Sequence, residues 1–177
     1  MVSVGSAFLE SATRRLLYYK ELGDKTFVQL SDADFHFCPG EESNSIAVII
    51  QHMYGNMLSR WTDFLSTDGE KEWRNRDAEF ETTAASKEQL LVNWKQSWAC
   101  CLNAIAAFTE NDLLQIVIIR GEALTVVDAI NRQLAHYPYH VGQIIFVAKM
   151  IKETQWQNLS VPRNKSGEYN EMQKQKK

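Results

Sequence analysis

Residues 125–152, TVVDAINRQLAHYPYHVGQIIFVAKMIK, decide the fold of this 177-residue chain. Apolar side chains recur every three or four positions along this stretch and form one stripe: Val127, Ile130, Leu134, Tyr137, Val141, Ile144, Ala148 and Ile151. That period is typical of an amphipathic α-helix, and Thr125 followed by Asp128 is a helix-capping pattern. We therefore predict one long helix over about residues 125–153, with one face in a core.

Three earlier segments show the same period. The predicted helices cover about residues 2–22, 46–65 and 86–109. Gly23 follows the first of them where a helix-terminating residue is expected, and Ser86 with Gln89 forms a capping box before the third. Four such helices bury their apolar stripes most simply as a bundle, so we expect an all-α, four-helix fold.

Two segments that connect the predicted helices lack the helical period. In residues 115–126, QIVIIRGEALTV, β-branched residues flank Gly121, which predicts a short β-hairpin between the third and fourth helices. Residues 67–85, TDGEKEWRNRDAEFETTAA, are charged and show no period, and we expect Trp73 and Phe80 to hold this loop over one end of the bundle.

The chain is expected to form one domain. We predict that residues 1–159 form the bundle and that residues 160–177 form a polar tail, either disordered or lying on the surface through Val161, Pro162 and Tyr169.

Composition narrows the classes of function. Apolar residues make up 45% and charged residues 23%, as in an ordinary globular protein. A net charge of −3 gives no positive field for nucleic acid, and the apolar runs are shorter than the roughly 20 residues of a membrane span. The N-terminus lacks a signal-peptide pattern. We expect a cytoplasmic protein that binds neither nucleic acid nor membrane.

The cysteines support the same compartment. Their number is odd and two are adjacent, which favours structural thiols in a reducing environment over a disulfide framework: Cys38, Cys100 and Cys101.

Three of the four histidines point to one site. His136 and His140 are four residues apart, so on a helix their side chains differ by about 40° and can reach one ion. His52 has nearly the same offset from the apolar stripe of its own predicted helix. Neutral imidazoles bind Zn²⁺, Ni²⁺, Fe²⁺ or Mn²⁺, and three protein ligands leave room for water or substrate. The alternative is a set of core or partly exposed imidazoles that hydrogen-bond to neighbours.

Other notable side chains have ordinary interpretations. Pro138 lies between the two helical histidines and predicts a local bend, which either opens room for an ion or is a simple kink. His36 has no partner at ligand spacing and is left out of the site. Four aromatic residues are expected in the core: Tyr54, Trp94, Trp98 and Tyr137.

A histidine in the second helix followed by H-x-x-x-H in the last resembles the pattern of the DinB-like, or DinB/YfiT-like, superfamily. Residues 49–81, IIQHMYGNMLSRWTDFLSTDGEKEWRNRDAEFE, and 134–152, LAHYPYHVGQIIFVAKMIK, more specifically resemble a bacterial subfamily of unknown function. The resemblance implies a bundle in up-down-down-up order, a divalent metal ion at one end and a homodimer. Its ligands would be His52, His136 and His140.

The superfamily includes bacillithiol S-transferases and mycothiol-dependent maleylpyruvate isomerases, in which the metal is thought to activate a small thiol. The resemblance thus implies an enzyme that transfers a low-molecular-weight thiol to an electrophile, because a metal-bound thiol loses its proton at neutral pH. Asn56 or Tyr137 would order the site. Arg60 and Arg132 are candidate contacts to the thiol by position, or else surface or salt-bridge arginines.

Two other functions stay open at this point. A metal-dependent hydrolase would activate a bound water and would need a nearby carboxylate or histidine base, which the sequence does not reveal. A non-catalytic stress protein would use the ion to fasten two helices, and a fourth protein ligand would favour that role.

Overall fold

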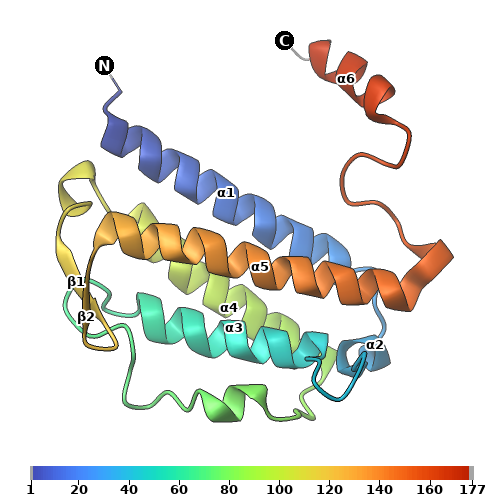
Figure 1. Ribbon diagram of the computed structural model, residues 1–177, viewed down its shortest axis with the longest axis horizontal. Coiled ribbons are helices and arrows are strands. Elements are labelled where there is room, and N and C mark those ends of the chain that lie inside the picture. Colours follow the sequence, from blue (N-terminus) through green and yellow to red (C-terminus); the bar gives the residue numbers. More distant parts are fainter. Residues whose placement is uncertain (1, 176–177) are drawn as a thin grey trace.

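The computed structural model describes residues 2–175 and consists mainly of four long helices that lie side by side (Figure 1). These helices are α1 (Val4–Phe27), α3 (Ile46–Trp61), α4 (Lys87–Ala106) and α5 (Val126–Lys152). The shorter elements are α2 (Asp32–His36), η1 (Asp77–Phe80), η2 (Glu110–Asp112), β1 (Ile116–Ile119), β2 (Glu122–Thr125), η3 (Glu153–Gln155) and α6 (Ser166–Lys174). The predicted helical bundle with a hairpin between its last two long helices is confirmed. Residues 1, 176 and 177, at the ends of the predicted domain and tail, lie outside the described range.

The helices follow the up-down-down-up order. In Figure 1, α1 and α5 run in one direction, whereas α3 and α4 run in the other. The most extensive helix contacts join α3 to α4 and α1 to α5, and the contact between α3 and α5 is much smaller. The backbones of α3 and α5 therefore approach each other less closely than those of α3 and α4 or of α1 and α5.

The connection from α3 to α4 differs from the expectation. Because these two helices are parallel, the chain must return along the whole bundle before α4 can begin, and Figure 1 shows this return beside α3. The segment was predicted to cover one end of the bundle, and this prediction is wrong (Figure 1). Trp73 is 60% exposed and does not hold the segment in place. The second predicted contact is present, because Phe80 in η1 packs against the ring of His52 on α3.

Each long helix begins where a hydroxyl side chain can cap it. The side chain of Ser45 accepts a hydrogen bond from the amide of Val48, and the side chain of Thr125 accepts one from the amide of Asp128. Ser3 and Ser86 cap α1 and α4 in the same way. These bonds satisfy amides that have no partner within the helix, which explains why the helix starts were readable from the sequence.

The helix ends were less readable. Helix α1 was predicted to end before Gly23 but continues to Phe27, and Gly23 is buried. A Cβ atom at Gly23 would lie 2.4 Å from Cζ2 of Trp94. The glycine therefore permits close packing of α1 on α4, and does not terminate the helix. Helix α3 ends at Trp61, earlier than predicted, because Thr62 is extended.

The β-hairpin is attached to the segment that follows α3. Its turn residues, Arg120 and Gly121, have φ values of 57° and 74°, as a tight two-residue hairpin turn requires. The carboxylate of Asp68 accepts hydrogen bonds from both turn amides, at 2.8 and 2.9 Å. This contact fixes the hairpin, and with it Arg120, beside α3.

The core contains three of the four predicted aromatic residues. Trp94, Trp98 and Tyr137 are fully buried, whereas Tyr54 is only half-buried. Helix α5 is continuous through Pro138. Helix α6 contributes no buried residue, and the domain boundary at residue 159 stays a prediction. In the described part of the chain, no helix has both the length and the apolar character needed to cross a membrane.

Candidate metal centre

The structure brings His52, His136 and His140 together. Nε2 of His136 lies 3.5 Å from Nε2 of His52 and 3.0 Å from Nε2 of His140. One ligand atom from each residue lies within 4.8 Å of the others. His36 is exposed on α2 and takes no part in this cluster. The histidines that the sequence selected are therefore the ones that meet, and together they could hold a metal ion.

The cluster lies in the seam between α3 and α5. His52 comes from the middle of α3, and the other two histidines come from the middle of α5. The position midway along the bundle differs from the expected position at one end. The three imidazole rings lie between α3 and α5, whose backbones make few close contacts with each other.

Every ring has an oxygen acceptor at its Nδ1. Nδ1 of His52 lies 2.9 Å from Oε2 of Glu79. Nδ1 of His140 lies 2.8 Å from Oε1 of Gln143, whose amide group is oriented by a hydrogen bond that it donates to the Tyr139 hydroxyl. The third ring, His136, has Oε1 of Gln133 at 3.3 Å.

These partners at Nδ1 determine the protonation state of Nε2, the other nitrogen of each ring. A neutral imidazole has one N–H and one lone pair, and a proton held on Nδ1 leaves the lone pair on Nε2. Three lone pairs then face one another, and a cation between them would relieve their repulsion. Ring nitrogens about 2.0–2.1 Å from one ion would lie about 2.9–3.4 Å apart, close to the two separations of His136 from His52 and His140, 3.5 and 3.0 Å. The donor set therefore fits a divalent transition-metal ion.

Burial keeps two of the rings neutral. Desolvation, helped by the other rings and by Arg60, lowers the pKa of His136 to about 3. Desolvation also lowers the pKa of His140 to about 4, although the hydrogen bond with Gln143 opposes it. Because only the neutral ring can bind a metal, both rings are in their binding form at neutral pH.

Sequence reasoning missed Glu79. This residue lies in η1, is 6% exposed, and joins His52 to Arg74. Its carboxylate accepts two hydrogen bonds from Arg74, at 2.7 and 2.9 Å. Burial raises the pKa of Glu79, but the bonds from Arg74 and His52 outweigh this effect and hold that pKa below its ordinary value. Glu79 is one of several acidic residues in an irregular segment, and no local pattern distinguishes it.

The ion pair of Glu79 and Arg74 belongs to a longer series of ionic contacts. Arg74 also donates to Glu70 at 3.0 Å, and Glu70 accepts a hydrogen bond from Arg120 at 3.2 Å. The series thus runs from the hairpin turn to His52. Arg74 is almost fully buried within it, so its charge is matched by two carboxylates.

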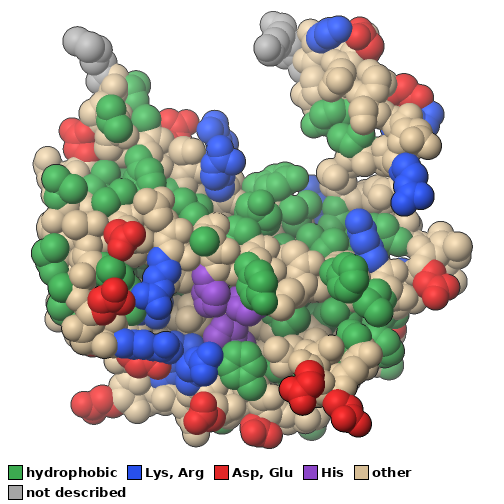
Figure 2. Space-filling view, in the orientation of Figure 1, with side chains coloured by type: hydrophobic (Ala, Val, Ile, Leu, Met, Phe, Trp, Pro, Cys, Tyr) green, Lys and Arg blue, Asp and Glu red, His purple; other side chains and the backbone are tan. Residues whose placement is uncertain are grey.

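A cavity of about 300 Å³ opens beside the histidines. It is lined by His52, Asn56, Arg60, Arg76, Phe80, Arg120, Arg132, Gln133, Tyr139, His136 and His140. Figure 2 shows the histidine side chains in this hollow, with a group of Lys and Arg side chains on one side of them. Four of the lining residues are arginines, and none is acidic. The cavity therefore combines possible metal ligands with positive charge.

The other residues singled out by the sequence have distinct places. Tyr137 is fully buried; its hydroxyl accepts a hydrogen bond from Trp61 and donates one to Oδ1 of Asn56 at 3.2 Å. Asn56 therefore offers its N–H groups to the cavity. Arg132 is exposed and lies 3.6 Å from a Glu122 oxygen, as the salt-bridge interpretation predicted.

The cysteines lie outside the cluster. Burial raises the pKa of Cys100 and Cys101, and the thiol of Cys38 donates to backbone carbonyl groups of its own loop. These contacts agree with structural thiols.

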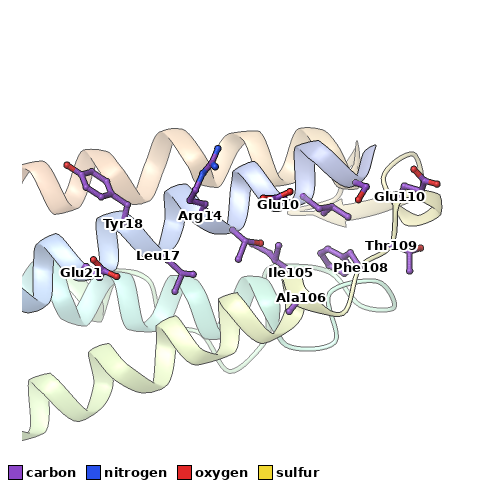
Figure 3. A pocket seen from close by; sticks show the side chains of 13 residues that line it. Glu10, Arg14, Leu17, Tyr18, Glu21, Ile105, Ala106, Phe108, Thr109 and Glu110 are labelled. Atoms are coloured by element: carbon purple, nitrogen blue, oxygen red, sulfur yellow. The ribbon is translucent and has the colours of Figure 1, made fainter. Parts of the chain in front are cut away.

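A larger groove of about 890 Å³ lies between α1 and the end of α4 (Figure 3). Its lining contains neither histidine nor cysteine, so it lacks the ligand types that distinguish the smaller cavity.

Comparison with solved structures agrees with the observed fold. The chain is similar in structure to a protein described as "Crystal structure of the conserved protein of locus from Enterococcus faecalis", with a TM-score of 0.61 and 15% identity over 80% of this chain and 95% of that one. At this identity the similarity concerns the fold alone. No curated protein matches the chain. Residues 3–165 match the family model described as "Protein of unknown function (DUF1572)", and because this match spans most of the chain, the protein belongs to the DUF1572 family.

Proposed function

We propose that this protein is a metal-dependent enzyme of the DinB-like type, in which His52, His136 and His140 hold one divalent ion beside the substrate cavity. The observation that carries the proposal is the orientation of the three rings. Their Nε2 atoms converge, while each Nδ1 faces an oxygen. Outward partners of this kind fix the tautomer of metal-binding histidines and increase their basicity.

The number of ligands favours catalysis over a structural ion. Within residues 2–175, no fourth His, Cys, Asp or Glu joins the cluster, and the cavity opens next to the rings. Structural zinc sites are usually closed by four protein ligands, whereas catalytic sites keep one position for water or substrate. This arrangement supports an enzyme more than an ion that only fastens two helices.

The reaction we propose is the transfer of a low-molecular-weight thiol to an electrophile. When bound, the ion would supply positive charge that lowers the pKa of a thiol. In the overall reaction the thiol sulfur bonds to an electrophilic carbon, the leaving group departs with the electron pair of its bond, and the thiol proton is released. No oxidant or reductant is needed.

The residues of the chain would bind and shield the reactants. The ring of Phe80 lies 4.7 Å from that of His52, centroid to centroid, and restricts the access of water to this side of the cluster. Asn56 is held by Tyr137 and presents donors to the cavity. At about 300 Å³ the cavity is at the small end of ligand pockets, which favours small substrates.

Hydrolysis is less well supported. A water nucleophile would need a base in the cavity, but no Asp or Glu is among the residues that line it. The nearby carboxylate, Glu79, faces Nδ1 of His52 and is held there by Arg74. Glu79 is therefore a positioning residue for His52, because it lies on the side of the ring away from the cavity.

Cobalt spectroscopy tests the proposal without a known substrate. The Co²⁺-loaded protein should gain a sulfur-to-metal charge-transfer band when a small thiol is added at millimolar concentration, and the His52→Ala variant should not. A panel of thiols and electrophiles then identifies the reaction. If no thiol changes the spectrum of the loaded protein, the transferase proposal is wrong, whereas thiol inhibition of a hydrolytic activity would support the alternative.

A further inference from the structure

Arg60 is the most unusual charged residue in the described structure. It extends from the last turn of α3, is only 2% exposed, and lines the cavity beside the histidines. Its Nε and Nη1 atoms are buried and have no hydrogen-bond partner in the described part of the chain. A buried guanidinium without an acceptor is expensive, because burial removes its water and nothing replaces it.

Among the described residues, the local packing around Arg60 offers no acceptor to its buried nitrogen atoms. Gly69 lies so close that a Cβ atom there would be 2.7 Å from Nη1 of Arg60. The carbonyl oxygen of Gly69 accepts a hydrogen bond from the Ser59 hydroxyl, and that hydroxyl also accepts one from the amide of Lys71. The neighbouring polar groups are thus paired with one another and not with the guanidinium.

The rest of the cavity adds positive charge without adding an acid. Arg76, Arg120 and Arg132 also line it. The neighbouring carboxylates lie outside the cavity and already have partners: Glu70 and Glu79 bond to Arg74, and Glu122 lies near Arg132. The carboxylate of Asp68 accepts hydrogen bonds from three backbone amides. The cavity therefore has unmatched positive charge, and a negatively charged ligand would supply the missing acceptors.

We infer that the cavity binds an oxyanion group, a carboxylate or a phosphate, of a small substrate, with Arg60 as its buried contact and Arg120 and Arg132 nearer the surface. Both groups offer oxygen acceptors in the spacing that a guanidinium recognises. This inference rests on the proposed function, because it names the class of substrate for that reaction. The substrate would be an anionic molecule whose charged group binds the arginines while its reactive part faces the histidines.

Binding of simple anions to metal-free protein tests this inference separately from the metal. Thermal unfolding is measured with sodium phosphate, with sodium acetate and with sodium chloride at matched ionic strength and constant pH. A ligand that binds only the folded state raises the unfolding temperature, so phosphate, acetate or both should raise it above the chloride value. Calorimetric titration then gives the affinity, and the comparison of phosphate with acetate distinguishes the two groups.

The decisive variant is Arg60→Met, which keeps most of the side-chain volume and removes the charge. Anion affinity should fall by about 10-fold or more, as expected for the loss of a charged hydrogen-bond donor. Without the anion, this variant should unfold at the same temperature as the unmodified protein or a higher one, because an unpaired buried charge has been removed. Arg15→Met, at an exposed position on α1, should change neither property.

A second variant guards against a failure to fold. Arg132→Met changes an exposed side chain at the cavity, and it should weaken anion binding severalfold while leaving the fold intact. The inference is overturned if neither phosphate nor acetate raises the unfolding temperature above the chloride value. It is also overturned if folded Arg60→Met and Arg132→Met both keep full anion affinity. Anion binding by a protein that takes up no metal would refute only the proposed function, whereas metal uptake without anion binding would refute only this inference.

Discussion

The carboxylate of Glu79 accepts a hydrogen bond from Nδ1 of His52 at 2.9 Å, on the side of the ring opposite to His136. Residue 79 lies 27 positions along the chain from His52, in the segment that returns beside α3. This segment therefore does more than connect two parallel helices. It supplies the charge that orients one of the three rings.

The first prediction concerns that charge. Glu79→Gln keeps an oxygen that can accept from His52 but removes the negative charge, so metal affinity should fall by about 10–100-fold. Competition with a chromophoric chelator measures the affinity. Glu81→Gln is the matched control, because Glu81 is exposed and close in sequence; an equal loss in both variants would show that Glu79 has no particular role.

The second prediction uses the space that Gly55 leaves for Glu79. A Cβ atom at Gly55 would lie 2.2 Å from Oε1 of Glu79, so Gly55→Ala should displace the carboxylate and weaken metal binding about as much as Glu79→Gln does. Gly142→Ala is the control on α5, since a Cβ atom there meets nothing within 4 Å. This control should keep its metal affinity and gain up to about 1 kcal/mol of stability from helix propensity. Unchanged metal affinity in Gly55→Ala would contradict the prediction.

The third prediction concerns acid stability of the metal-free protein. The pKa of His136 is lowered to about 3 and that of His140 to about 4, from an ordinary value of 6.5. Below pH 6.5 the unfolded chain therefore binds protons at these residues that the folded protein does not bind. The free energy of unfolding should be fully retained above pH 6.5 and should decrease as the pH falls toward the folded-state values.

Denaturant unfolding at several pH values measures this effect. The range from pH 6.5 down to about 4.5 separates it from the titration of Asp and Glu residues. A variant with both His136→Gln and His140→Gln should show a shallower dependence on pH in this range. An identical slope in the variant and the unmodified protein would exclude the two histidines as its source.

The fourth prediction concerns the close packing of α1 on α4. Gly23→Ala should lower the free energy of unfolding by about 1–3 kcal/mol, the usual cost of overpacking a core. The added methyl group would meet the buried ring of Trp94, which cannot move freely. Chemical denaturation measures the change, and a variant as stable as the unmodified protein would show that the α1–α4 contact adjusts easily.

Much of this fold could be predicted because its signals are local. The apolar stripe of α5, the caps at Ser45 and Thr125, and the Gly121 hairpin turn each depend on residues close in sequence. Gly23 was misinterpreted because a glycine that ends a helix and one that admits Trp94 look alike in a sequence. The difference lies in a residue 71 positions away, which no local pattern includes.

In the candidate site, too, features that depend on local sequence could be predicted and features that depend on distant residues could not. The three histidines could be selected because their spacing and helix faces are local properties. Glu79 and the unpaired state of Arg60 depend on how the return segment packs against α3, so the sequence could not reveal them. The predicted homodimer concerns contacts between chains and stays a prediction.

The most direct test of the account is the metal content of the purified protein, measured by inductively coupled plasma mass spectrometry after saturation with one divalent metal and removal of the excess. The unmodified protein and the His36→Ala control should each bind one ion per chain. His136→Ala and His140→Ala should each lose it, because two remaining ligands form only a weak site. One ion per chain in both of these variants, or loss of the ion in His36→Ala, would contradict the three-histidine site.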